Sequence, residues 1–87
     1  MTIFPPDPNL AALRLALARL RSERGWTYDE LASRSGLARR TLIEIEQGRT
    51  IGSLKSWHAI AHAFGVSVEY FFTRLCEGHE PPGGATP

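Results

Sequence analysis

The chain has 87 residues, which is enough for one hydrophobic core and too few to divide between two. Its apolar content of 43% is ordinary for a globular protein, and charged residues interrupt the apolar stretches, so no segment predicts a membrane span. A formal net charge of +1 excludes the strongly basic composition that would by itself indicate a nucleic-acid partner.

The distribution of charge is more informative than its sum. Between Arg14 and Lys55 there are nine basic and five acidic residues, whereas the rest of the chain has one basic and four acidic residues. A solvated helical surface explains this bias on charge alone, and a surface for an anionic partner is the alternative. The N-terminus lacks the basic start and apolar run of a secretory signal, so the expected location is the cytoplasm.

The first helix is expected to begin with Asp7 as its N-cap and Pro8 as its first residue, because proline lacks only an N–H that would be unpaired there. Gly25 is expected to end it. Between these points a leucine stripe with spacings of three and four predicts an amphipathic helix: Leu10, Leu13, Leu17 and Leu20.

The second helix is expected to follow Thr27 and to end at Gly36. Thr27 and Glu30 have the spacing of a reciprocal capping box, in which each side chain accepts a hydrogen bond from the other residue's backbone N–H. Three more helices are expected at about residues 38–47, 54–64 and 68–76, with N-caps at Ala38, Ser53 and Ser67.

The sequence therefore predicts an all-α, compact five-helix bundle. We expect an N-terminal extension over residues 1–8, one domain over residues 9–76 and a disordered Gly/Pro-rich tail over residues 77–87. Within the domain, the second and third helices have the spacing of a helix-turn-helix: small Ala32, then Gly36 in the turn, then Leu42 and Ile45 as apolar anchors.

The stretch from Leu13 to Phe72 resembles the Xre family of phage-repressor-type (lambda-repressor-like) helix-turn-helix domains. The residues that carry the resemblance are Leu13-Arg14, RSERGWT at 21–27, ELASRSGL at 30–37, TLIEIEQGR at 41–49 and AHAFGVSVE at 61–69. The resemblance implies a five-helix transcriptional regulator that binds a palindromic operator in double-stranded DNA as a homodimer. No cofactor is expected.

The resemblance also implies which residues contact DNA bases in the major groove: Arg39, Arg40, Thr41 and Glu44. Their chemistry is suitable, because an arginine can donate two hydrogen bonds to guanine and a glutamate can accept one from cytosine. The alternative for Arg40 and Glu44 is a surface ion pair only. Phosphate contacts are expected near the N-termini of the second and fourth helices, from Thr27, Tyr28, Arg49, Thr50, Ser53 and Lys55.

Three positions depart from the family pattern. Tyr28 stands where many relatives have a glutamine that braces both a phosphate and the recognition helix, so that brace is replaced or absent here. Ala38 replaces the usual Ser or Thr cap, and Ile43, where a polar residue is common, is expected to be partly exposed. The family pattern further implies a structural ion pair between Arg21 and Glu46, and the alternative is that they are two independent surface charges.

The end of the chain is rich in aromatic residues, and some of this surface is expected to form a dimer interface. The expected interface residues are Trp57, Tyr70, Phe71, Phe72 and Leu75. The alternative is that all of them belong to the internal core.

No catalytic or metal site is expected. His58 and His62 have a spacing that metals use, but no third ligand is identifiable, and Cys76 has neither a disulfide partner nor an evident base. The competing function is a regulator that mainly binds protein, such as an antitoxin that neutralises a toxin and uses its helix-turn-helix for autoregulation.

Overall fold

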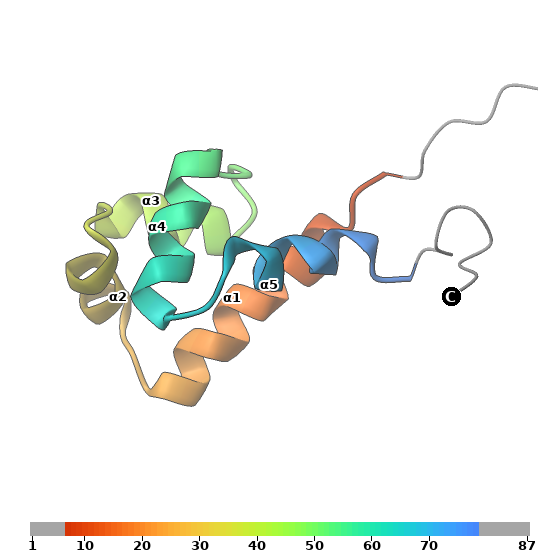
Figure 1. The fold of residues 1–87 in the computed structure, drawn as a ribbon. Coiled ribbons are helices and arrows are strands. Elements are labelled where there is room, and N and C mark those ends of the chain that lie inside the picture. Colours follow the sequence, from red (N-terminus) through yellow and green to blue (C-terminus); the bar gives the residue numbers. More distant parts are fainter. Residues whose placement is uncertain (1–6, 79–87) are drawn as a thin grey trace, which may run out of the picture.

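The computed structural model describes residues 7–78 and contains a bundle of short helices (Figure 1). The elements are α1 (Leu10–Arg24), α2 (Tyr28–Ser35), α3 (Arg39–Glu46), α4 (Leu54–Phe64), α5 (Val68–Phe72) and the 3₁₀ helix η1 (Thr73–Cys76). The predicted five-helix architecture is thus confirmed, with one difference at the end. The expected fifth helix is α-helical only to Phe72 and tightens into η1 for its last turn.

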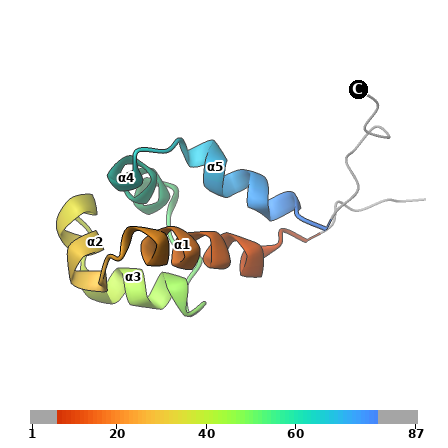
Figure 2. The same cartoon turned by 90° about the horizontal axis from the view of Figure 1, so that it is seen from below.

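Helix α1 is the central element of the bundle. Seen from below, it lies between α3 on one side and α5 on the other (Figure 2), and it packs against α3, α5 and η1. The leucine stripe explains this position, because Leu13, Leu17 and Leu20 are buried on the inner face. The bundle therefore has α3 on one outer surface and the α5–η1 segment on the opposite one.

One hydrophobic core joins all five α-helices. Its most buried members are Leu13, Ala16, Leu17, Leu20, Leu31, Leu42, Ile45, Trp57, Ile60, Ala61, Phe64 and Phe71. Aromatic pairs stabilise its α4–α5 side, where the ring centroids of Trp57 and Phe71 lie 5.2 Å apart. The indole N–H of Trp57 donates to the Ile51 carbonyl at 2.8 Å, which ties the loop before α4 to the core.

The start of α1 differs from the prediction. Asn9, rather than Asp7, is the N-cap, and its Oδ1 accepts a hydrogen bond from the Ala12 N–H at 2.9 Å. Asn9 also contacts the other end of the chain, since its backbone N–H donates to the Leu75 carbonyl at 2.8 Å and its Nδ2 donates to the Glu77 carbonyl at 3.1 Å. A cap at Asn9 therefore joins the two ends of the domain, which a cap at Asp7 two residues earlier does not do.

The expected N-terminal extension and C-terminal tail fall largely outside residues 7–78. Most of the expected extension (1–8) and tail (77–87) lies outside the described residues, which include only residues 7 and 8 of the first and 77 and 78 of the second. Within residues 7–78, no helix is both long and apolar enough to cross a bilayer.

Candidate functional site

The helix-turn-helix is formed by α2, the turn at residues 36–38 and α3. Thr27 Oγ1 caps α2 by accepting from the Glu30 N–H at 3.1 Å, as predicted. The other half of the capping box is absent from the hydrogen bonds of the described residues, because the Glu30 carboxylate instead accepts from Arg34 Nε at 2.8 Å. Gly36 takes the left-handed conformation (φ 79°), which a glycine adopts without strain, and so directs the chain into α3.

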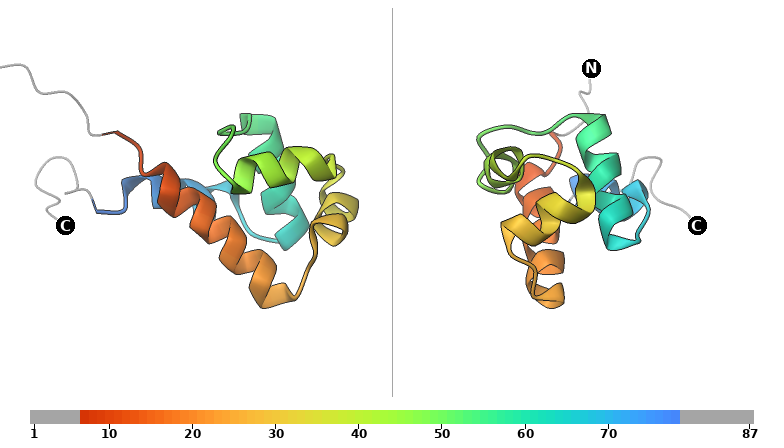
Figure 3. Two further views of the ribbon diagram at one scale, coloured as in Figure 1. Left: turned by 180° about the vertical axis from the view of Figure 1, so that it is seen from behind. Right: turned by 90° about the vertical axis from the view of Figure 1, so that its left-hand side faces the viewer.

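Helix α3 is held by its buried face. Leu42 and Ile45 are fully buried in the core, whereas Ala38 supplies no side-chain cap at the helix start, as expected. The left view of Figure 3 shows α3 on the surface of the bundle, in front of α4. The outer face of α3 is therefore open to a partner while its inner face is fixed.

The residues expected to contact bases lie together on α3. Arg39 and Arg40 are exposed, whereas Thr41, Ile43 and Glu44 are half-buried. Arg40 Nε lies 3.4 Å from Glu44 Oε2, one helical turn away, and 89% of the Arg40 side chain is exposed. The pair is weakly held, because exposed i,i+4 ion pairs contribute only about 0.3–0.5 kcal/mol.

A second ion pair, which sequence reasoning missed, connects α2 to α3. Arg39 Nε lies 3.1 Å from Asp29 Oδ1, so the first turn of each helix contributes one partner. The two residues are ten positions apart in sequence, and no periodic pattern relates them. Only the angle between the two helices brings them together.

Arg21 and Glu46 form the most extensive polar cluster of the described residues. Arg21 donates from Nη2 to Glu46 Oε1 at 2.7 Å and from Nε to Glu46 Oε2 at 3.0 Å, and its Nη1 donates to the Trp26 carbonyl at 3.0 Å. The pair thus connects α1, the loop before α2 and the last turn of α3. Tyr28 completes the cluster by donating its hydroxyl to Glu46 Oε1 at 3.0 Å, with the Arg21 guanidinium 4.2 Å from its ring centre.

Burial and hydrogen bonding shift two pKa values in this cluster. The hydrogen bonds to Glu46 raise the pKa of Arg21 above its ordinary value, so Arg21 is a permanent cation. Desolvation raises the pKa of Tyr28, and the hydrogen bond to the Glu46 carboxylate raises it further. At neutral pH the Tyr28 hydroxyl is therefore a proton donor committed to Glu46.

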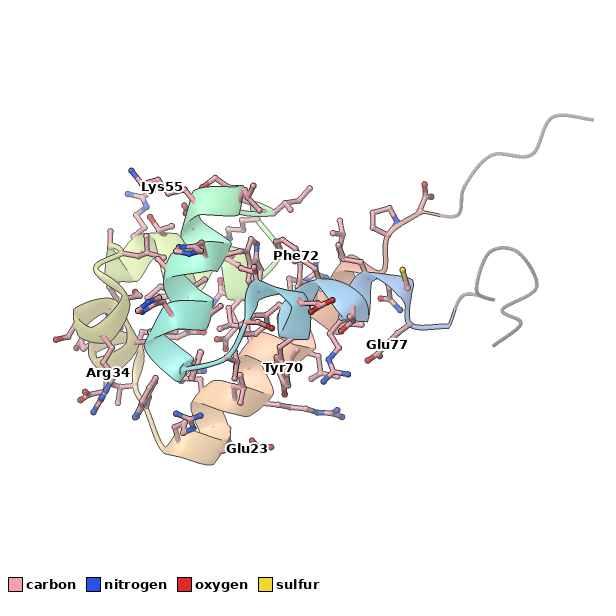
Figure 4. All side chains as sticks on the ribbon, in the orientation of Figure 1. Glu23, Arg34, Lys55, Tyr70, Phe72 and Glu77 are labelled. Atoms are coloured by element: carbon pink, nitrogen blue, oxygen red, sulfur yellow. The ribbon has the colours of Figure 1, made fainter. Side chains whose placement is uncertain are left out.

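The expected phosphate contacts fall into two groups. At α2, the Thr27 hydroxyl caps its helix and the Tyr28 hydroxyl faces Glu46, so both side chains are engaged within the domain. At the loop and start of α4 the side chains are exposed: Arg49, Thr50, Ser53 and Lys55. Figure 4 shows Lys55 at the outer end of α4, well away from Glu77.

The two helix ends also differ in charge. The first turn of α2 contains two carboxylates, Asp29 and Glu30, whereas the first turn of α4 contains no acidic residue and includes Lys55. Because helix N-termini attract anions and a nearby carboxylate opposes that attraction, α4 is the better placed of the two to contact phosphate.

The expected dimer residues do not form one surface. Trp57 is only 2% exposed and Phe71 is fully buried, so the expectation that they lie at an interface is wrong. They are the large side chains that α4 and α5 need to fill the core. Tyr70, Phe72 and Leu75 are half-buried and retain outward-facing surface.

A shallow groove lies beside Tyr70, between α1 and the α5–η1 segment. Its volume is about 190 Å³, and its lining includes Leu15, Arg19, Tyr70 and Arg74. Small-molecule pockets usually exceed about 300 Å³, so the groove is small for a ligand site. Leu15 is one of the exposed large apolar residues of the domain, together with Ile51 and Leu54.

The residues considered for metal binding or catalysis are on the surface. His58 and His62 are exposed on α4 with ring centres 6.0 Å apart, and Cys76 is exposed at the end of η1. Among residues 7–78, no cluster of three or more His, Cys, Asp or Glu side chains is arranged to hold a metal ion.

Comparison with known proteins gives a consistent result. The family described as Helix-turn-helix (HTH_3) matches residues 15–71, which is more than half of the chain. An uncharacterised HTH-type transcriptional regulator from Methanothermobacter thermautotrophicus is 43% identical over 53 residues, which cover 61% of this chain and 77% of that protein.

Solved structures agree with the sequence comparison. The clp gene regulator ClgR from Corynebacterium glutamicum is 35% identical with a TM-score of 0.69, and the match covers 82% of this chain and 77% of that chain. The N-terminal DNA binding domain of SinR from Bacillus subtilis is 28% identical with a TM-score of 0.65, covering 80% and 99%. SinR is also similar in a complex with SinI protein, at 29% identity and a TM-score of 0.64, covering 78% and 64%.

Proposed function

The chain belongs to the Xre/Cro-type helix-turn-helix family (HTH_3) of DNA-binding transcriptional regulators, and we propose that it is a repressor or autoregulator that binds a two-fold symmetric operator as a homodimer. In this proposal α3 enters the major groove and Arg39, Arg40, Thr41 and Glu44 contact base edges. The proposal rests above all on one observation: α3 is fixed to the core by Leu42 and Ile45 while its exposed face presents two arginines.

Arg40 is the central base-contacting residue of this proposal. Its guanidinium is free of the core and held only by the weak pair with Glu44, so base acceptors can compete for it at small cost. A bidentate contact to guanine O6 and N7 would contribute about 1–3 kcal/mol of discrimination against other bases. Glu44 would then either accept from cytosine N4 or keep Arg40 in position.

Phosphate contacts are assigned mainly to the loop before α4 and its first turn. Arg49, Thr50, Ser53 and Lys55 are exposed there, and the backbone N–H groups at the start of α4 add a favourable dipole. Thr27 is proposed to contact a phosphate through its backbone N–H, because its hydroxyl already caps α2. Tyr28 is proposed to contact a phosphate only where its hydroxyl is shared between Glu46 and the phosphate. Such contacts fix orientation without discriminating sequence.

The homodimer is proposed to form through the α5–η1 side of the molecule. Tyr70, Phe72 and Leu75 keep part of their surface outward, and Leu15 of α1 adds an exposed apolar side chain that lines the same groove as Tyr70. A two-fold dimer would place two recognition helices about 34–36 Å apart, which is one turn of DNA. Sedimentation of Leu15→Glu and Tyr70→Glu variants tests this, since a monomer–dimer equilibrium unaffected by both would exclude this interface.

Selection of bound duplexes from a random-sequence pool tests base readout. The wild type is expected to enrich a palindromic motif, and Arg40→Ala is expected to relax it at one symmetric pair of positions. Arg34→Ala is the matched control, because Arg34 is also an exposed arginine in an i,i+4 pair with a glutamate, but lies on α2. Binding without enrichment, or no binding by a folded protein, would contradict the proposal.

A protein-binding regulator is the second candidate, and the similarity to SinR in its complex with SinI protein favours it. In that case the chain would bind a toxin or another regulator, with DNA binding reserved for autoregulation. Co-purification with the product of a neighbouring gene, combined with loss of operator binding in the complex, would distinguish this role from that of a free-standing repressor.

A further inference from the structure

The pair between Asp29 and Arg39 is the contact in the helix-turn-helix that the proposed function leaves unexplained. Asp29 Oδ1 lies 3.1 Å from Arg39 Nε, and the side chains are 81% and 59% exposed. We infer that Asp29 is a specificity-determining residue, which orients Arg39 for base contact and withholds it from phosphates. This inference rests on the proposed function, because it assigns a role within the same DNA-binding surface.

The pair has little to do with folding. Exposed ion pairs contribute little to stability because water solvates both partners well, and α2 is already fixed to α3 by the packing of buried Leu31 and Leu42. The Asp29 carboxylate therefore acts mainly at the protein surface, where it offsets the charge of the Arg39 guanidinium and sets its orientation.

The geometry of the pair leaves one edge of the guanidinium available. The carboxylate oxygen is paired with Nε of Arg39, and the hydrogen bonds within residues 7–78 include none from its two terminal nitrogens, so both can donate to a ligand. A fork of two parallel N–H groups is the arrangement that guanine O6 and N7 accept. An arginine already oriented by a neighbour loses less conformational freedom when it makes this contact than a free one does.

The charge of Asp29 acts in the opposite direction on phosphates. Asp29 lies in the first turn of α2, where a helix N-terminus would otherwise attract an anion, and it neutralises the nearest cation on α3. Non-specific binding depends on phosphate contacts, whereas specific binding adds base contacts. A carboxylate at this position therefore weakens non-specific binding more than binding to a site with a guanine opposite Arg39.

Asp29→Asn tests the inference, and the same chain offers a matched control. Glu30→Gln removes the same charge from the same helix turn, but the ion pair of Glu30 is with Arg34 of its own helix rather than with an arginine of α3. Figure 4 shows Arg34 on α2, well away from the Lys55 end of α4. Affinities for the selected duplex and for a scrambled duplex of equal length are measured over a range of salt concentrations for both variants.

Asp29→Asn is expected to lower the ratio of specific to non-specific affinity by about fivefold, the lower end of what one bidentate base contact provides. Its salt dependence on the scrambled duplex should steepen by about 0.9, which corresponds to one added phosphate contact. Glu30→Gln is expected to leave the ratio within about twofold of wild type, as for an ordinary surface substitution. In an Arg39→Ala background, Asp29→Asn should no longer change the ratio.

The outcomes separate the two hypotheses. If the wild type selects no motif, the proposed base readout fails, and the role of Asp29 fails with it. If the wild type selects a motif and Asp29→Asn changes the specificity ratio no more than Glu30→Gln does, the proposed function stands and the inference is wrong. An equal effect of Asp29→Asn with and without Arg39 would also overturn it, because the carboxylate would then act by its charge alone.

Discussion

Replacing Glu46 by glutamine removes the charge that holds α1, the Trp26 loop and α3 together, while keeping the side-chain volume. Arg21 would lose the charge assistance of its bonds of 2.7 and 3.0 Å to Glu46, and one of the two altogether, because the amide offers one acceptor oxygen in place of two; its bond to the Trp26 carbonyl would remain. The Tyr28 hydroxyl would exchange a carboxylate acceptor for an amide. The perturbation thus leaves a guanidinium without a counter-ion in a partly desolvated site.

The magnitude follows from the burial of the two partners. Removing one partner of a fully buried pair costs about 3–5 kcal/mol. Here the Glu46 side chain is 10% exposed and the Arg21 side chain 22% exposed, so water can partly solvate the remaining cation. We expect a loss of about 2–3 kcal/mol in the free energy of unfolding, or about 10–20 °C in Tm for a domain of this size.

Urea denaturation followed by circular dichroism measures this loss, with Glu44→Gln as the control. Glu44 lies on the same helix and undergoes the same substitution, but its partner Arg40 is exposed, so a change below about 0.5 kcal/mol is expected. The m-value should be unchanged in both variants. If Glu46→Gln costs no more than Glu44→Gln, the Arg21–Glu46 cluster is not what holds α3 against α1, and the reasoning is refuted.

Two further substitutions test other parts of the structure. Gly52→Ala is expected to cost about 1–3 kcal/mol in urea denaturation, because φ is +88° and the new Cβ would lie 2.9 Å from Ile45 Cδ1 and 3.0 Å from Trp57 Nε1; a loss below about 0.5 kcal/mol would mean that the loop relaxes freely. Tyr28→Phe is expected to cost about 0.5–1.5 kcal/mol at neutral pH through the lost bond to Glu46. Because the folded pKa of Tyr28 is raised, its contribution is complete below the ordinary tyrosine pKa of about 10 and is lost as the pH rises through the folded value. Stability curves for Tyr28→Phe and wild type should therefore converge in alkali, and a constant difference would contradict the assignment of the hydrogen bond.

Local signals in the sequence predicted most of the fold. The caps at Thr27 and Ser53 depend only on a hydroxyl and an N–H three residues later, so they can be recognised from the sequence around them. The cap of α1 could not be recognised from its local sequence, because contacts with Leu75 and Glu77 near the other end of the domain select Asn9. Asp7 and Pro8 satisfy the same local rule, and only the tertiary contacts distinguish the two starts.

The sequence alone does not show which of the aromatic side chains are buried and which are exposed. The sequence shows that the α4–α5 region has more apolar surface than a short terminal helix needs, but not which side chains fill the core. Trp57 and Phe71 are buried because they meet each other and close the space between α4 and α5. Tyr70 and Phe72, which flank Phe71, point partly outward because neighbouring helix positions face different directions.

The polar residues of α3 are divided between two tasks by their exposure. Glu46, at the buried end, is held by Arg21 and Tyr28 in contacts that are expensive to break, so it fixes where the helix lies. Arg40, at the exposed end, is held by a weak surface pair with Glu44 that a base can replace at little cost, and Arg39 beside it is paired with Asp29 of α2. Substitution at the buried end should therefore lower stability and weaken binding to all sequences alike, whereas substitution at the exposed end should change sequence preference in a protein that remains folded.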